Sequence, residues 1–234
     1  MENKINVMHI IRPASGGMKN HVLSLLKNLD PQVFNPILVC PRSVLKKYNT
    51  DFYYNVINID VDEKLNLKKD LSLFNELYKL ILREKVHIVH THGAKIGIIG
   101  RSAAYKAGVP VIINTVHNFY YETAPWHLKY PFIFLNRSLN KITDAQIAVS
   151  NALADNIVRT EKIAREKVHV IYNGIELDDF KFIMDCSLLQ KKYGIDPKKP
   201  VIGVISRLIP QKGIQYFLKA AKITLDVLPD VQFV

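Results

Sequence analysis

The stretch VISRLIPQKG, Val204 to Gly213, combines two cations with the expected start of a helix. Apolar residues that predict a buried strand lead into it, and an amphipathic helix is expected from Gly213 or Ile214. Arg207 and Lys212 would therefore meet the free N–H groups of a helix N-terminus, an arrangement that suits a diphosphate. The alternative is a solvated basic loop.

A glycine pair marks a second candidate site, in GGMKNHV (16–22). Gly16 and Gly17 follow the first expected strand at the turn into a helix. Glycines let the backbone approach a ligand closely, and the helix N-terminus there presents N–H groups to an anion. The spacing G-x-G-x-x-G is absent and no acidic residue ends the second expected strand, so this is not a dinucleotide fingerprint. The alternative is a turn in which the glycines serve only the backbone.

Histidines close two of the expected strands, in VHIVHTHG and NTVHNF. The carboxyl ends of parallel strands form the ligand crevice, so we expect His90 or His92, and His117, to point toward a common cleft. Polar contacts to a substrate, a metal site and satisfied structural histidines are the three interpretations. Neither Cys nor an acidic residue accompanies these histidines at metal-ligand spacing, so we predict no metal.

The elements that must position these residues show a repeated βα pattern. Short apolar runs predict buried strands at 5–11, 36–40, 55–59, 87–91, 110–116, 145–149 and 168–172. Most of the intervening stretches have helical periodicity. Strands that are apolar on both faces and alternate with helices predict an α/β fold, a mostly parallel, doubly wound sheet covered by helices on both sides.

Two helices are especially clear. The stretch DLSLFNELYKLILREK (70–85) places apolar residues on one face, namely Leu71, Phe74, Leu77 and Leu80 or Ile81. Another helix is expected after Ser150, a good N-cap, with an apolar stripe of Leu153, Ile157 and Val158.

The pattern changes near the end of the chain. KKYGIDPKKP (191–200) is rich in Lys, Gly and Pro and is typical of a connection between domains. We predict a first Rossmann-like domain over residues 1–170, a connection over 171–200, and the first βαβ unit of a second domain over 201–234. This second domain is expected to be incomplete, because a doubly wound domain needs on the order of 100 residues to cover its sheet.

The cysteine content and the N-terminal sequence indicate the cellular compartment of the protein. The chain has 234 residues, 48% of them hydrophobic, and only two cysteines, Cys40 and Cys186. Two such distant cysteines make no disulfide framework, and the N-terminal apolar stretch is too short for a signal peptide. We therefore predict a cytoplasmic protein.

The charge and the aromatic residues favour an anionic partner. The net charge is +11, and residues 1–152 hold 19 Lys and Arg against 11 Asp and Glu. Within this basic part, residues 118–141 mix seven aromatic side chains with His127, Lys129, Arg137 and Lys141, which suits an anionic membrane surface. The alternatives are that the aromatics fill the core and that the charge is only solvated. No recognised nucleic-acid module accompanies the charge, so we expect no nucleic-acid partner.

Five motifs in this order resemble family 4 of the retaining, nucleotide-sugar-dependent glycosyltransferases. They are GGMKNHV, NTVHNF, IAVSNALADNI, VIYNGIELDDF and GVISRLIPQKGIQYFLKA. The resemblance implies the two-domain GT-B fold, with the acceptor on the first Rossmann-like domain and the donor mainly on the second. It also implies a reaction without metal or other cofactor.

The resemblance assigns roles to individual residues. Gly16 and Gly17 match the loop that approaches the donor diphosphate and sugar, and His117 matches a catalytic histidine near the transferred sugar. Arg207 and Lys212 match the pair that binds the diphosphate. Breaking the bond between sugar and diphosphate leaves negative charge on the leaving group, which two cations and a helix dipole would stabilise.

The expected function is transfer of a hexose-type sugar, with retention, from a nucleotide-diphosphate donor to a saccharide or lipid-linked acceptor. The setting would be cell-surface polysaccharide or glycolipid assembly, with peripheral attachment to the inner face of the membrane. A non-catalytic nucleotide-binding fragment and a sugar-nucleotide epimerase of the same fold are the alternatives. The family's E-x7-E glutamate pair is expected beyond Val234, so we expect a truncated chain that is inactive alone.

Overall fold

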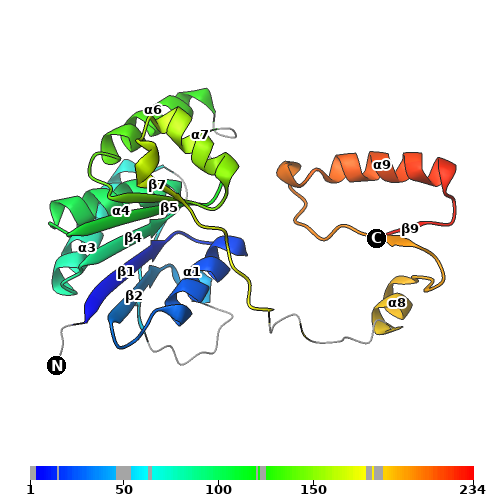
Figure 1. Ribbon diagram of the computed structural model, residues 1–234, viewed down its shortest axis with the longest axis horizontal. Helices are drawn as coiled ribbons and strands as arrows, with labels where there is room; N and C mark the ends of the chain where they lie inside the picture. The colour runs from blue at the N-terminus through cyan, green and yellow to red at the C-terminus, as the bar shows by residue number, and fades with distance from the viewer. Residues whose placement is uncertain are drawn as a thin grey trace. The chain divides into compact units, whose positions relative to one another are not determined.

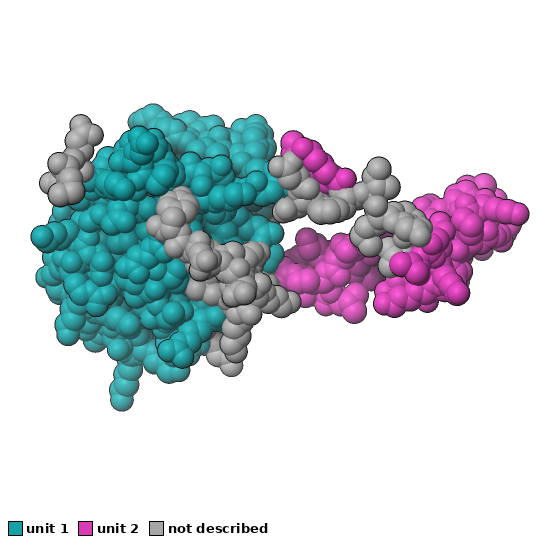
Figure 2. Space-filling model, turned by 90° about the horizontal axis from the view of Figure 1, so that it is seen from below, with its two compact units in different colours: residues 1–176 teal, residues 177–234 magenta. Residues whose placement is uncertain are grey.

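A computed structural model describes residues 4–14, 16–45, 54–62, 65–119, 121, 125–177, 181 and 187–234 (Figure 1). The chain divides into two compact units, residues 1–176 and 177–234, which Figure 2 shows in different colours. Helix α8 (Ser187–Tyr193) belongs to the second unit and lies within residues 171–200, the stretch predicted as a connection.

The first unit is built on one seven-stranded sheet in the order β3-β2-β1-β4-β5-β6-β7. Its strands are β1 (Ile5–Ile11), β2 (Phe34–Cys40), β3 (Asn55–Asn58), β4 (Ile88–His92), β5 (Val111–Val116), β6 (Ala145–Ala148) and β7 (Val168–Val170). All neighbouring pairs are parallel. Each of the seven predicted apolar runs therefore overlaps a strand, and the predicted parallel α/β class is confirmed.

Helices connect these strands. They are α1 (Gly17–Asn28), α2 (Arg42–Leu45), α3 (Leu67–Arg83), α4 (Ala94–Lys106), α6 (Trp126–Leu139) and α7 (Asn151–Glu161), with a 3₁₀ turn η1 at Arg165–Lys167. The predicted N-cap is confirmed, since the Ser150 hydroxyl accepts a hydrogen bond from the Leu153 amide at 3.2 Å. The Asn66 side chain caps α3 in the same way, through the Lys69 amide.

Alternate residues of the central strands enter cores on opposite faces of the sheet. Met8 and Ile10 of β1 pack with α3 and α4 in one core, whereas Ile11 packs with Val22 and Leu26 of α1 in another. This period of two, seen also in β2, is the expected behaviour of strands covered on both faces. Figure 1 shows α1 and α3 separated by the sheet.

The predicted apolar face of α3 is partly wrong. Leu73, rather than Leu71, is buried together with Leu77, Leu80 and Ile81, and 62% of Leu71 is exposed. Both leucines lie within one turn, so helical spacing alone admits two overlapping stripes, and packing against β1, β2 and β4 selects the one through Leu73.

Helix α4 approaches the sheet closely because two of its residues have no side chain. A Cβ atom on Gly100 would lie 2.7 Å from Thr91 Cγ2, and one on Gly97 would lie 2.8 Å from Asn114 Oδ1. Glycine at these positions therefore lets α4 rest directly on β4 and β5, which fixes the loop that joins β4 to α4.

The second unit contains the predicted βαβ arrangement. Strand β8 (Val201–Ile202) leads through η3 (Pro210–Lys212) and α9 (Ile214–Val227) to β9 (Gln232–Phe233), and β8 and β9 are parallel. The predicted strand is shorter than expected, because it ends at Ile202 and Val204 and Ile205 are exposed. Ala221 is the one buried side chain of α9.

Candidate functional site at the carboxyl edge of the sheet

The strand order creates a switch point between β1 and β4. The chain leaves β1 toward β2 and β3 on one side and returns to β4 on the other, so the loops after β1 and β4 diverge at the carboxyl edge of the sheet. Ligands of open α/β sheets bind at such a point. A pocket of about 570 Å³ lies there, lined by Arg12 after β1, by Gly93 to Ile96 after β4, and by Asn118 after β5.

One side of this switch-point pocket is electropositive. Arg12 passes beside Gly93, since a Cβ on that glycine would lie 3.4 Å from Arg12 Cδ. Gly93 is the N-cap of α4, has φ 119° and provides no side-chain cap. The first N–H groups of α4 and the Arg12 guanidinium therefore lie close together, which favours an anionic group. Lys95 also lines the pocket and forms a 2.6 Å ion pair with Asp70.

The rest of the pocket is largely apolar apart from Asp62, whose carboxylate forms a 3.2 Å ion pair with Lys69. Its wall includes Leu128 and Phe132 of α6, together with Met18, Val61, Leu65 and Ile96. A pocket with a cationic mouth and an apolar wall suits an amphiphilic ligand with an anionic group.

Five histidines gather beside this pocket on the α1 side of the sheet. His9 of β1 is paired in register with His90 of β4, and His92 follows two residues later on the same face. His21 comes from α1, and His117 follows β5. Their ring centroids lie 4.1 to 5.9 Å apart in the six pairs that touch.

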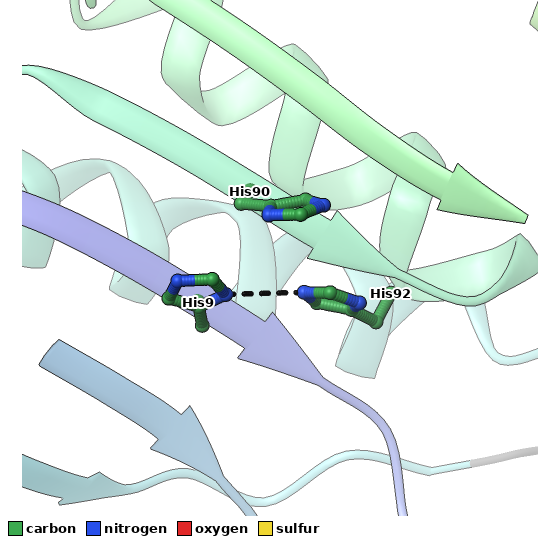
Figure 3. A group of neighbouring side chains, drawn as sticks. All are labelled: His9, His90 and His92. Carbon is green, nitrogen blue, oxygen red and sulfur yellow. Dashed lines mark hydrogen bonds between the residues drawn. The ribbon is translucent and has the colours of Figure 1, made fainter. Parts of the chain in front are cut away.

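Hydrogen bonds link three of these rings in a row. His9 Nδ1 lies 3.2 Å from His92 Nε2, and His92 Nδ1 lies 3.3 Å from His117 Nε2. His90 Nε2 lies 2.7 Å from Thr115 Oγ1. Figure 3 shows His9, His90 and His92 converging from β1 and β4.

The histidines are held in the neutral form. Burial, with a smaller contribution from His21, lowers the pKa of His9 to about 4. Burial, followed by His21 and Arg12, lowers the pKa of His117 to about 4 as well. Burial and the neighbouring histidines hold the pKa values of His90 and His92 well below their ordinary value. Each ring therefore carries one proton near neutral pH.

The structure places three of the five predicted site residues in the first unit and two in the second. In the first unit, His117 joins the histidine cluster, as expected for residues that close neighbouring strands. Gly16 has φ 79° and caps α1, and a Cβ on Gly16 or Gly17 would meet nothing within 4 Å, so both remain accessible to a ligand. In the second unit, Arg207 and Lys212 are exposed and precede α9, which begins directly after Gly213. Their roles with a donor stay predictions.

Sequence reasoning missed several residues of the site. Arg12 directly follows β1, and the rule that ligands bind at strand ends could have singled it out. His9 and His21 carried no signal, because a single histidine in an apolar strand or helix resembles an ordinary core residue.

The aromatic stretch at 118–141 divides between core and surface. Tyr121 and Phe132 are buried, whereas Trp126, Tyr130 and Phe134 of α6 are 76%, 65% and 70% exposed. These three positions are spaced by four residues and share one face of the helix. Among the described residues, no helix combines the length and apolarity needed to span a bilayer.

The fold and the switch-point pocket define a Rossmann-like ligand-binding unit of the α/β class. The sequence profile of Glycosyltransferase Family 4 matches residues 15–179, most of the chain. The chain belongs to glycosyltransferase family 4, as the resemblance predicted.

Named relatives agree with this assignment. The chain is 32% identical to a UDP-Gal:alpha-D-GlcNAc-diphosphoundecaprenol alpha-1,3-galactosyltransferase of Escherichia coli, covering 99% of this chain and 62% of the relative. It is 30% identical to the capsular polysaccharide biosynthesis glycosyltransferase CapM of Staphylococcus aureus, covering 89% and 59%. The chain thus spans about three fifths of the length of these relatives.

Solved structures share the fold at lower identity. Anabaena HepE in complex with UDP-glucose has a TM-score of 0.69 at 16% identity, covering 98% of this chain and 68% of that one. A UDP-GlcNAc 2-epimerase from Neisseria meningitidis has a TM-score of 0.62 at 14% identity, covering 98% and 65%. The fold is therefore shared with an epimerase, and the family match favours the transferase over the epimerase.

Proposed function

We propose that this chain carries the acceptor side of a retaining glycosyltransferase that moves a sugar from a nucleotide-diphosphate donor to a lipid-linked or saccharide acceptor. The observation that carries the proposal is the switch-point pocket, where Arg12 and the α4 N-terminus meet an apolar wall. A lipid-linked diphosphate sugar presents the matching features, an anionic group next to an apolar chain. The acceptor named for the E. coli relative is of this kind, and CapM is named for capsular polysaccharide biosynthesis.

The donor side of the proposal rests on the second unit. Arg207, Lys212 and the N-terminus of α9 would hold the diphosphate and stabilise the charge that develops on it as the sugar leaves. In the first unit, Gly16, Gly17 and His117 are the residues for which the family resemblance implies a role with the donor. In this mechanism the cations and helix dipoles stabilise the negative charge on the leaving diphosphate, so the transfer step uses no metal. The UDP-glucose complex of HepE supports a nucleotide-sugar donor for this fold.

A transfer assay with a chimera tests the proposal. Residues 1–200 of this chain are joined to the donor-binding portion of the E. coli relative, and labelled UDP-Gal is supplied with a diphosphate-linked lipid acceptor. We expect labelled lipid product, and at least about a tenfold loss of kcat/KM for the acceptor in Arg12→Met, because a charge-assisted contact is lost. His169→Gln, an exposed substitution on β7, is the control.

Other outcomes would contradict the proposal. Interconversion of the donor without any labelled acceptor product would favour the epimerase alternative. Nucleotide binding without turnover would favour a non-catalytic binding role.

We further propose that the protein attaches peripherally to the inner face of the membrane through α6. Trp126, Tyr130 and Phe134 present an aromatic face suited to the bilayer interface, and the exposed Arg137 and Lys141 lie beside it in sequence. Attachment there would bring the protein to a lipid-linked acceptor.

A further inference from the structure

We infer that His9, His90 and His92 form a binding site for one divalent transition-metal ion of the Zn²⁺, Ni²⁺ and Cu²⁺ class. Each of the three side chains offers one ring nitrogen, and these nitrogens lie within 4.8 Å of one another. All three residues are buried. They lie on two adjacent parallel strands, as Figure 3 shows, and hydrogen bonds between these strands hold the backbone at the three positions.

Two of the ring nitrogens are separated by nearly the distance found between nitrogens that bind the same metal ion. Zinc–nitrogen distances near 2.0–2.1 Å in a tetrahedral site place two ligand nitrogens about 3.3 Å apart. His9 Nδ1 and His92 Nε2 are already 3.2 Å apart. The His90 nitrogen lies within 4.8 Å of the other two, and water or an anion would take the fourth position, as in other three-histidine zinc sites.

The protonation state also suits a metal ligand. A metal binds the neutral imidazole, and burial keeps these rings neutral at physiological pH, so binding displaces no proton from a cationic ring. The Thr115 hydroxyl engages His90 Nε2 at 2.7 Å, which leaves His90 Nδ1 for the ion. Ligating histidines are usually oriented by such a partner on their second nitrogen.

Internal hydrogen bonds do not account for the whole cluster. His9 Nε2, His21 Nε2 and His117 Nδ1 are buried nitrogens that find no hydrogen-bond partner among the described residues. A neutral ring shares one proton between two nitrogens, so the row from His9 through His92 to His117 leaves an unsatisfied nitrogen at each end whichever way its protons point. Such groups cost free energy when buried. The ion assigned here would bind His9 Nδ1 and His92 Nε2, so these three nitrogens lie outside its coordination, and the assignment rests on the spacing of the ligand nitrogens.

The sequence argument against a metal depended on ligand spacing along the chain. The fold instead assembles the ligands across two strands, with a separation of 81 residues between His9 and His90. A bound ion would also fix the tautomer of His92. With Nε2 on the ion, Nδ1 carries the proton and donates to His117 Nε2, which leaves the proton of His117 on Nδ1.

A second triad, His21, His92 and His117, competes for the same ion through the shared His92. We assign the site to the first triad because its three residues are anchored in the sheet, whereas His21 lies on α1 and His117 in a loop. Single substitutions separate the two, because only the first triad contains His9 and only the second contains His117.

The test is a titration of the untagged, chelator-treated 234-residue chain with Zn²⁺ by calorimetry, and with Co²⁺ by visible absorption. We expect one ion per chain, tetrahedral Co²⁺ bands and a raised melting temperature. His9→Gln should weaken Zn²⁺ binding by at least about tenfold, since loss of a ligand costs no less than loss of an outer partner. The exposed His169→Gln should retain binding. His117→Gln removes the outer partner of His92, but its amide oxygen can still accept from His92, so it should weaken binding less than His9→Gln does.

Melting curves of the metal-free variants show whether His9→Gln is folded, and His90→Asn provides a second ligand variant. Equal Zn²⁺ binding by wild type and by both ligand variants would overturn the inference. Loss of binding in His117→Gln but not in His9→Gln would move the ion to the second triad and overturn the assignment made here. Because the readout is metal binding alone, its result is independent of sugar transfer.

Discussion

Arg101 and Glu161, two buried side chains of opposite charge, are joined through a single amide. Asn140 Oδ1 accepts from the Arg101 guanidinium at 3.4 Å, and Asn140 Nδ2 donates to Glu161 at 2.9 Å. Burial lowers the pKa of Arg101 to about 10, with Glu161 acting in the opposite direction. Since Arg101 lies on α4, Asn140 at the end of α6 and Glu161 at the end of α7, this network connects three helices, of which α4 and α6 line the switch-point pocket.

Glu161→Gln should destabilise the protein by about 3 kcal/mol. The substitution leaves the buried Arg101 without its countercharge and replaces an acceptor for Tyr121, Asn140 or Gln146 with a donor. Urea denaturation measures the loss, and the exposed Glu166→Gln should change stability by less than about 0.5 kcal/mol.

The coupling itself is measured by adding Arg101→Met. If the two charges stabilise one another, the double variant is less destabilised than the sum of the single variants. Strict additivity would show that Arg101 and Glu161 act independently.

Gly100→Ala should cost about 1–3 kcal/mol, because the new methyl group would lie 2.7 Å from Thr91 Cγ2 in a packed core. Adding Thr91→Ser removes that methyl and keeps the hydroxyl that donates to Asn114 at 2.8 Å. Thermal melts should therefore show recovery of most of the loss, helped by the better helix propensity of alanine. A double variant no more stable than Gly100→Ala would contradict close packing of α4 as the cause.

Stability should fall as the pH drops below about 6.5 when no metal is present. A histidine whose pKa is lowered on folding stays neutral in the native state while the unfolded chain takes up protons, so stability is lost from the unfolded pKa downward. For His9 the change from 6.5 to about 4 corresponds to at most about 3 kcal/mol.

Denaturation at pH 7.5, 6 and 5, roughly the range of that titration, measures this loss in the presence of a chelator. His9→Gln should flatten the dependence, because glutamine does not titrate. A stability that rises on acidification would show that the rings become protonated in the folded state instead.

Replacing Trp126, Tyr130 and Phe134 together by Ser should abolish sedimentation with anionic vesicles while the melting temperature stays unchanged. The reason is that all three side chains are exposed on α6 and contribute little to the core. Tyr105→Ser, an equally exposed aromatic on α4, is the control.

Trp126 is the only tryptophan of the chain, so its emission in the wild type reports this face directly. A blue shift with vesicles that weakens as salt is raised would fit combined aromatic and basic contacts. Vesicle binding retained by the triple variant would place any membrane contact elsewhere.

The elements of the first unit follow from the sequence more directly than the site does. Strand positions and the Ser150 cap are local features: apolar runs predict the strands, and one hydroxyl at the start of a helix predicts the cap. Selecting Leu73 over Leu71 requires knowing what α3 packs against, which periodicity does not contain.

The site depends on residues that only the topology brings together. The order β2-β1-β4-β5 makes neighbours of His9 and His90, and it places Arg12 beside Gly93. His117 and the histidines of VHIVHTHG were recognisable because each closes a strand, whereas the partners of His117 on β1 and α1 became visible only in the folded chain.

Helix α6 has two different faces, with Leu128 and Phe132 lining the switch-point pocket and Trp126, Tyr130 and Phe134 exposed. A protein held at a bilayer by the outer face would sample its acceptor by diffusion in a plane instead of in a volume. Occupancy of the pocket would then depend on the surface density of the lipid-linked acceptor in the membrane. Its effective concentration near the bound protein could far exceed its bulk concentration, although no contact in the pocket has changed. Helix α6 would thus provide both the surface that binds the membrane and part of the wall of the pocket that binds the acceptor.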